Sequence, residues 1–228
     1  MGAKFEMGRI AGLPIVIDIS FLITMVLFFQ GYFTSGNSTL MSIGFLLAVG
    51  LAISILIHEF AHAVAGHNLG VSPSHVELNG LGGLCYWAGP LPQAAWRRIV
   101  IYLVGPLSNF VLYLLFTALA DMSVIHANPY VFRIVSSLAW VNGWMAVFNL
   151  LPAFPLDGGR ALDAFLGQFV TFKTARTVVG VLGLCLAGYC AYLAVMGDTW
   201  MFVLALLLGL DNYNAVQDAS NPPWQRRN

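Results

Sequence analysis

The chain has few charged residues. Only 9% of its 228 residues are Asp, Glu, Lys or Arg, whereas 59% are hydrophobic; soluble domains carry about 25% charged residues. Its ten basic and ten acidic side chains cancel, so no broad positive surface for nucleic acid is expected. The three cysteines are expected to be small apolar packing residues, and no cleavable signal peptide is evident. This composition indicates an integral membrane protein.

The sequence contains several long apolar runs. A helix needs about 20 largely apolar residues to cross a bilayer, and six candidate spans satisfy this requirement approximately: 18–34, 41–66, 99–120, 130–151, 176–196 and 199–215. Asp18 and Ser20 at the start of the first span are expected to be capping residues at the membrane surface.

The basic residues predict the orientation of these spans. With six spans both termini lie on one side, and nine of the ten Lys and Arg fall on that side: Lys4, Arg9, Arg97, Arg98, Arg160, Lys173, Arg176, Arg226 and Arg227. Arg133 alone is left opposite. The positive-inside rule makes the basic side cytoplasmic, so both termini are predicted to be cytoplasmic.

Two segments outside the spans indicate β structure on the cytoplasmic side. Residues 8–17 contain Gly and Pro breakers and β-branched residues, and they predict one short strand. Residues 71–93 alternate loosely and contain Gly80, Gly82 and Gly83, which predicts a hairpin or a bent strand. A plain interfacial loop is the alternative for this second segment.

The predicted fold is an α-helical integral membrane protein with six transmembrane helices and short β-strands or a hairpin at the cytoplasmic side. No linker or internal repeat divides it. A single membrane-embedded domain over 1–228 is therefore expected, with core motifs in 41–66, 99–120 and 130–160.

The motif His-Glu-Phe-Ala-His at residues 58–62 lies inside an apolar stretch of about 43–65. His58 and His62 are four residues apart, so they share one face of a helix. HExxH is a signature of zinc hydrolases, in which two imidazoles bind the ion beside a carboxylate base. Ordinary packing is the alternative, but ionisable groups inside a membrane are costly and usually functional. The motif predicts a water-consuming zinc site within the membrane.

Two histidines leave a tetrahedral zinc incomplete, so a third ligand, His or carboxylate, is needed beside an open position for water. The segment 149–160 contains two prolines and two glycines, so it is not expected to be helical, yet it is apolar and should be buried. Because a carboxylate is unusual in a buried, apolar segment, Asp157 is the candidate third ligand. The second and fourth spans both run inward, so they deliver His58 and Asp157 to the same cytoplasmic end. A turn residue is the alternative for Asp157.

A Gly-Pro-Leu-Ser-Asn sequence at 105–109 interrupts the third span. Proline removes a backbone hydrogen bond and kinks a helix. A packing kink with close helix approach at Gly105 is favoured over a direct chemical role, and Asn109 is expected to form a local hydrogen bond.

Taken together, HExxH in the second span, Gly-Pro-Leu-Ser-Asn in the third and Asn-x-x-Pro-x-x-Pro-Leu-Asp-Gly-Gly after the fourth resemble the site-2 protease family of intramembrane zinc metalloproteases. The resemblance implies one Zn²⁺ ion bound by His58, His62 and Asp157. It further implies that Glu59 is the catalytic base and that Asn149 helps to stabilise the oxyanion. The short segment between spans two and three and the short tail suggest a minimal form without PDZ or CBS domains.

The expected activity is zinc-dependent hydrolysis of peptide bonds in transmembrane segments of membrane proteins, or regulated intramembrane proteolysis, with Glu59 as general base for a zinc-activated water. A substrate helix must unwind before cleavage, and the extended peptide could then pair with a strand in 75–86. Gly82, Gly83 and Leu84 are the candidate substrate-binding residues.

The expected partners are a transmembrane protein or peptide substrate and the lipid bilayer, without nucleic acid, and the resemblance implies membrane-tethered regulators as substrates. The predicted location is a prokaryotic cell membrane. The oligomeric state is not predicted.

Three rival functions remain at this point. A membrane metal-ion transporter would spread its ionisable residues over several spans, whereas here they concentrate at one HExxH motif and one Asp. A membrane protease of prenylated C-termini would not need the 149–159 element. An inactive scaffold would not need Glu59.

Overall fold

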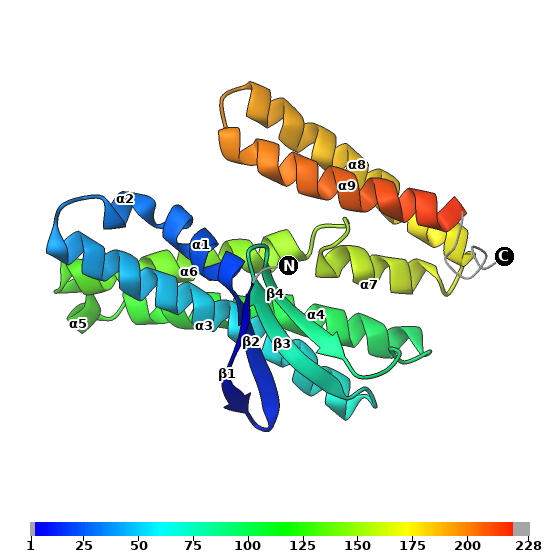
Figure 1. Ribbon diagram of the computed structural model, residues 1–228, viewed down its shortest axis with the longest axis horizontal. Helices are drawn as coiled ribbons and strands as arrows, with labels where there is room; N and C mark the ends of the chain where they lie inside the picture. Colours follow the sequence, from blue (N-terminus) through cyan, green and yellow to red (C-terminus); the bar gives the residue numbers. More distant parts are fainter. Residues whose placement is uncertain (1–2, 221–228) are drawn as a thin grey trace. The chain divides into compact units, whose positions relative to one another are not determined.

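The computed structural model describes residues 3–220 (Figure 1). They form two compact units. The first unit comprises the residues up to Leu91 together with Val104–Val147, and the second comprises Pro92–Leu103 and the residues from Phe148 onward. Arg226 and Arg227, which the sequence analysis assigns to the cytoplasmic side, lie outside the described residues.

Helices make up most of the described chain. In residues 3–220 they are α1 (Ile19–Phe28), α2 (Gln30–Phe33), α3 (Ser38–Asn68), α4 (Ala95–Ala120), α5 (Ser123–His126), α6 (Pro129–Asn149), α7 (Asp157–Leu166), α8 (Phe172–Val195) and α9 (Thr199–Ser220). Within this part of the chain, four helices are long and apolar enough to cross a membrane: α3, α4, α6 and α8. Four of the six predicted spans therefore correspond to helices of the required length and composition.

The two remaining predicted spans differ from expectation. The segment 18–34 forms α1 and α2 with a break at Phe29, and the ten residues of α1 extend only about 15 Å at ~1.5 Å per residue. The segment 199–215 lies within α9, whose second half carries polar side chains, including Asp211 and Asn212. α9 is not among the four candidates found in the described residues. The count of six spans stays a prediction.

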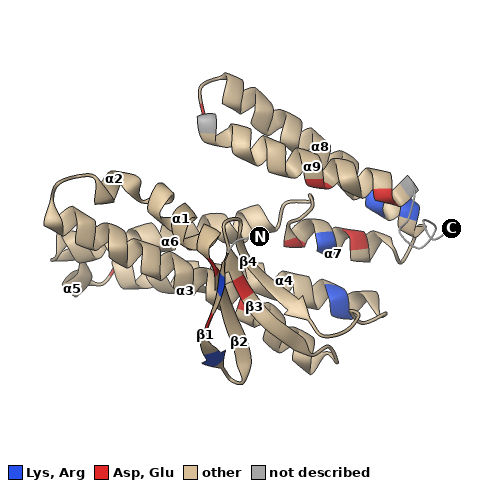
Figure 2. Cartoon of the chain, viewed as in Figure 1, with Lys and Arg blue, Asp and Glu red and all other residues tan. Residues whose placement is uncertain are grey.

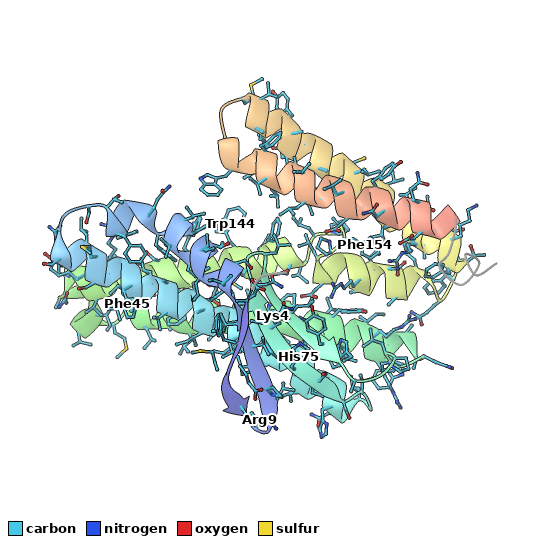
Figure 3. The ribbon with its side chains drawn as sticks, in the orientation of Figure 1. Lys4, Arg9, Phe45, His75, Trp144 and Phe154 are labelled. Atoms are coloured by element: carbon cyan, nitrogen blue, oxygen red, sulfur yellow. The ribbon has the colours of Figure 1, made fainter. Side chains whose placement is uncertain are left out.

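The long helices of the first unit expose apolar side chains. Phe45 on α3 is 61% exposed and Trp144 on α6 is 56% exposed (Figure 3). Charged residues are few on these helices and more frequent on the strands (Figure 2). Lipid is the medium in which such surfaces are stable, whereas water would disfavour them.

A four-stranded sheet belongs to the first unit. Its strands are β1 (Lys4–Ile10), β2 (Leu13–Asp18), β3 (Pro73–Asn79) and β4 (Gly82–Trp87), in the order β1-β2-β3-β4. β2 and β3 are parallel, with Ile15 opposite Val76, whereas the other two pairs are antiparallel. The hairpin predicted within 71–93 is confirmed as β3 and β4.

The prediction of a single strand over 8–17 is wrong, because the chain reverses inside that segment. Ile10 and Leu13 pair across a two-residue turn, in which Ala11 has φ +50° and Gly12 has φ +82°. Positive φ at both central residues is the requirement of the tight hairpin turn that matches strand twist. At the end of β2, Asp18 caps α1 by accepting a hydrogen bond from the Ser20 backbone N–H, as predicted.

The sheet packs one face against α3. Leu13, Ile15 and Val76 form a buried cluster with Ala63 of α3. On β3, Glu77 is buried, and its carboxylate accepts a hydrogen bond from Lys4 Nζ on β1 at 2.6 Å, across the intervening β2. This ion pair therefore joins β1 to β3 across β2.

In the second unit, a hairpin of α8 and α9 holds the loop before α7. A Cβ at Gly183 of α8 would lie 2.0 Å from Asn212 Oδ1, so only glycine lets Asn212 pack there. Asn212 accepts a hydrogen bond from the Phe154 backbone N–H at 2.9 Å and donates one to the Phe154 carbonyl oxygen at 2.7 Å. The buried amide thus satisfies both polar groups of a residue in an irregular loop.

Candidate metal centre

The helix α3 places the HExxH motif on its buried face. His58, Glu59 and His62 are each about 5–6% exposed, while their neighbours on the opposite face, such as Ile57, are exposed. The 3.6-residue helical repeat explains this division, because residues i and i+4 lie one above the other. The predicted pairing of the two imidazoles is therefore present in the structure.

The two imidazoles converge through the same type of nitrogen. The Nε2 atoms of His58 and His62 lie 3.1 Å apart, and the rings meet edge to face at 80° with centroids 4.8 Å apart. Two Nε2 lone pairs directed to one region are what a shared cation requires.

Gly105 lets the backbone of α4 pack closely against the two imidazoles. A Cβ built at Gly105 would lie 2.3 Å from His62 Nε2 and 2.7 Å from His58 Nε2, so no larger residue fits there without displacing them. Two imidazole nitrogens close together are ligands that zinc prefers, so the donor types present fit a metal ion. The predicted close approach at Gly105 is confirmed, whereas Pro106 does not end α4, which continues to Ala120.

Asn109 is the functional residue that the sequence analysis missed. Its Oδ1 lies 2.5 Å from His58 Nδ1, although the two residues are 51 positions apart and on different helices. Asn109 donates through Nδ2 to Asn142 Oδ1 at 2.9 Å, and Asn142 donates to Ser54 Oγ at 3.0 Å. Asn109 and Asn142 are fully buried. The expected local hydrogen bond is thus a contact between helices.

This amide chain fixes the tautomer of His58. Because Asn109 Nδ2 is the donor to Asn142, its Oδ1 is the acceptor, and His58 must carry its proton on Nδ1. Nε2 then presents a lone pair on the side shared with His62. Hydrogen bonds of this kind orient metal-binding histidines and raise their basicity.

Glu59 lies beside the edge strand of the sheet. A Cβ at Gly83 on β4 would lie 2.5 Å from Glu59 Cγ and 2.8 Å from Oε1. Burial, with a smaller contribution from the charge of Glu59, raises the pKa of the Cys85 thiol to about 12. The raised pKa disfavours the nucleophilic thiolate form of Cys85 at neutral pH.

Asp157 is the first residue of α7, in the second unit, and is 7% exposed. Gly158 and Gly159 lie in the first turn of α7 and let it pack closely against the preceding loop, because a Cβ at Gly158 would lie 2.2 Å from the Leu150 carbonyl oxygen and one at Gly159 would lie 2.4 Å from that of Ala153. The predicted burial holds for Asp157, Ala153 and Phe154, whereas Leu150, Pro152 and Pro155 are exposed. The expectation that 149–160 is non-helical is wrong for its last four residues, which begin α7. A buried carboxylate is the donor type that two imidazoles lack, so His58, His62 and Asp157 make a chemically suitable ligand set for one ion.

The other predicted site residues occupy two different elements. Asn149 is the last residue of α6 and is half-buried. Gly82, Gly83 and Leu84 are the first three residues of β4, and all are half-buried. Of this set, Gly83 is the residue whose backbone packs against Glu59.

The chain is similar in sequence to known zinc metalloproteases. The model of peptidase family M50 matches residues 122–188. Zinc metalloprotease MJ0392 of Methanocaldococcus jannaschii is 27% identical over 96% of this chain and 61% of its own length. Rip3 of Mycobacterium tuberculosis is 36% identical over 73% of this chain and 44% of its own length. The chain thus spans about half the length of these relatives.

The fold is shared with a solved protease structure. The site-2 protease from Methanocaldococcus jannaschii superposes with a TM-score of 0.68, covering 94% of this chain and 95% of the other, at 21% identity. At this level of identity the likeness concerns the fold.

Replacing Gly105 with Ala should abolish zinc binding, because the new Cβ would stand 2.3 Å from His62 Nε2. Metal content of the purified variant measures this effect. Gly188→Ala is the matched control, since a Cβ there meets no atom within 4 Å. A Gly105→Ala protein with a full complement of zinc would contradict this account of the space beside the imidazoles.

Replacing Asn109 with Leu should weaken zinc binding about 10- to 100-fold, the usual effect of losing the partner of a ligating histidine. Competition with a chelator measures the affinity. Asn109→Asp keeps an acceptor for His58 Nδ1–H but loses the donor to Asn142 Oδ1, so its affinity should lie between those of the wild type and the Leu variant. If the Leu variant binds zinc as the wild type does, the amide chain does not position His58.

Proposed function

We propose that this chain is a member of peptidase family M50, the site-2 proteases, and that it is a zinc-dependent endopeptidase that cleaves transmembrane segments of membrane proteins. The observation that carries the proposal is the pair of buried imidazoles, with Glu59 beside them, inside a helix apolar enough to cross a membrane. Both units would contribute to a single protease domain over 1–228.

In this proposal His58, His62 and Asp157 hold one zinc ion. Two neutral imidazoles and one carboxylate leave a net positive centre and an open fourth position, as hydrolytic zinc sites require. The bound ion would lower the pKa of a water molecule to about 7 and polarise the scissile carbonyl.

Glu59 acts as the general base in this proposal. It accepts a proton from the attacking water and then donates a proton to the leaving amine, so the carboxylate returns to its first state after each cycle. Its burial beside β4 supports this role, because a shielded carboxylate lies close to the strand along which a peptide would run. The Asn149 side-chain amide would donate a hydrogen bond to the developing oxyanion.

β4 is the proposed binding strand for the substrate. It lies at the edge of the sheet, with β3 as its neighbour on one side. An unwound peptide can add to such an edge through main-chain hydrogen bonds. Gly82, Gly83 and Leu84 would form these bonds, and the lack of a side chain on Gly83 brings the added strand close to Glu59.

The proposed location is a prokaryotic cell membrane, with the bilayer and a transmembrane substrate as partners. The basic residues at the starts of α4 and α8 support a cytoplasmic position for those ends and for both termini. We retain six spans in the proposal, with α9 and the α1–α2 segment added to the four long apolar helices.

The decisive test is Glu59→Gln. The variant keeps the size and polarity of the side chain but cannot accept the water proton, so cleavage should fall about 10²- to 10⁴-fold while zinc stays bound. Cleavage of a model transmembrane substrate and metal content are measured on the same preparation. Undiminished cleavage would reject Glu59 as the base.

Asp157→Ala tests the third ligand. Loss of a ligand should weaken zinc binding by more than the ~10- to 100-fold effect of losing an outer partner. Asp121→Ala, at an exposed position just after α4, is the matched control and should bind zinc as the wild type does. Unchanged metal affinity in Asp157→Ala would remove this carboxylate from the ligand set without affecting the assignment of Glu59.

A further inference from the structure

A polar pocket of about 370 Å³ lies within the second unit. It is formed by the start of α4, by α7, by the first turns of α8 and by the second half of α9, and Phe154 contributes to its wall (Figure 3). Its charged lining residues are Arg98, Arg160, Arg176, Asp163, Asp211 and Asp218. In Figure 2 blue and red segments accordingly gather on α7 and on the adjoining ends of α8 and α9. The proposed hydrolysis assigns no role to this pocket.

Two guanidinium groups in the pocket keep unused donors. The Nε atoms of Arg98 and Arg176 are buried and have no hydrogen-bond partner, and the same is true of Asp163 Oδ1. The Arg176 Nη1 to Asp163 Oδ2 distance is 3.6 Å, which is an ion pair but too long for a good hydrogen bond. Buried donors without acceptors are unfavourable, so the pocket is suited to a ligand that supplies acceptor oxygens.

Aromatic rings hold two of the arginines in place. The Arg176 guanidinium lies over Phe154 and Phe172, 5.0 and 5.5 Å from the ring centroids. The Arg160 guanidinium lies 6.0 Å from the centroid of Tyr102. Such stacking fixes the orientation of the planar guanidinium group before a ligand binds. A guanidinium group in a fixed orientation favours bidentate binding of a phosphate.

The three aspartates that line the pocket limit which ligands it can bind. Burial raises the pKa of the Asp163 carboxyl group, although Arg176 and Arg98 oppose the rise. Asp211 and Asp218 remain in the lining, and Asp211 is exposed. A phosphate alone would meet these carboxylates unfavourably, whereas a phosphate that carries an ammonium group satisfies charges of both signs.

Two of the helices that line the pocket are candidate membrane spans, and their ends contribute to it. Arg98 is in the first turn of α4 and Arg176 is the fifth residue of α8, and both helices are candidate membrane spans. Trp96 and Phe172, at the same helix ends, are exposed, as is typical of aromatic residues at the membrane surface. Basic pockets at the ends of membrane helices bind lipid headgroups.

We propose that this pocket binds the headgroup of a zwitterionic aminophospholipid of the phosphatidylethanolamine class. Arg98 and Arg176 bind the phosphate, and Asp211 faces the ammonium group. Phosphatidylcholine has no N–H to donate to a carboxylate, and phosphatidylglycerol has no cation, so both bind more weakly.

The test uses the full chain in nanodiscs of phosphatidylcholine to which phosphatidylethanolamine or phosphatidylglycerol is added. Native mass spectrometry of the released protein counts the retained lipids. The wild type should retain phosphatidylethanolamine in preference to the other two. Arg98→Gln should lower the apparent affinity for it about tenfold, and Asp211→Asn should abolish the preference over phosphatidylglycerol. Arg133→Gln, an exposed arginine of the first unit, is the matched control and should change neither.

Two soluble competitors distinguish a headgroup from a free anion. Phosphoethanolamine should displace the lipid, and inorganic phosphate at the same concentration should not. Displacement by inorganic phosphate would assign the pocket to a free anion and overturn the proposal. Equal retention of the three lipids by the wild type, or unchanged retention by Arg98→Gln, would overturn it as well. Zinc content reports whether each variant is folded, and the comparison of lipids on the wild type needs no variant.

Discussion

A buried imidazole has two nitrogens to satisfy, and the way His58 satisfies both determines the rest of the site. Nδ1 hydrogen-bonds to Asn109, so Nε2 is left for the region shared with His62. In a helix surrounded by apolar side chains, an unpaired nitrogen would be costly. The polar chain through Asn109, Asn142 and Ser54 provides the pairing without water. Neighbouring helices therefore hold α3 through the same side-chain atoms that orient the His58 imidazole.

Glycine residues allow close packing around the candidate site. Gly105 lets the backbone of α4 pack closely against the two imidazoles, and Gly83 brings a strand backbone to Glu59. In the second unit, Gly158 and Gly159 let the first turn of α7, which carries Asp157, pack against the preceding loop. The site thus depends as much on the absence of side chains at these positions as on its charged residues.

Several of these features could be predicted from the sequence because their signals are local. The four-residue spacing of His58 and His62 places them on one helix face, and the apolar segment with two prolines and two glycines predicts the burial of Asp157. Contacts between distant helices have no such signal, and for that reason the partnership of Asn109 with His58 was missed. The first hairpin was missed because Ala11 rarely adopts positive φ, which hid its turn.

The predicted span count illustrates the limit of hydropathy. The segment 18–34 is apolar enough to resemble a span, but hydropathy does not register the break at Phe29 that divides it into two short helices. α9 is long enough, but its second half carries several polar side chains, of which Asn212 bonds the Phe154 backbone. A sliding average reports neither the break nor the partner of this polar side chain.

The parallel pairing of β2 with β3 has a consequence for biosynthesis. These strands are neighbours in the sheet, yet α1, α2 and the whole of α3 lie between them in the chain. A ribosome must release α3, which carries the HExxH motif, before β3 can join β2, and β4 follows later still. Glu59 therefore meets Gly83 only after its helix has left the ribosome, so a nascent chain carries the carboxylate but lacks the strand proposed to present a peptide to it.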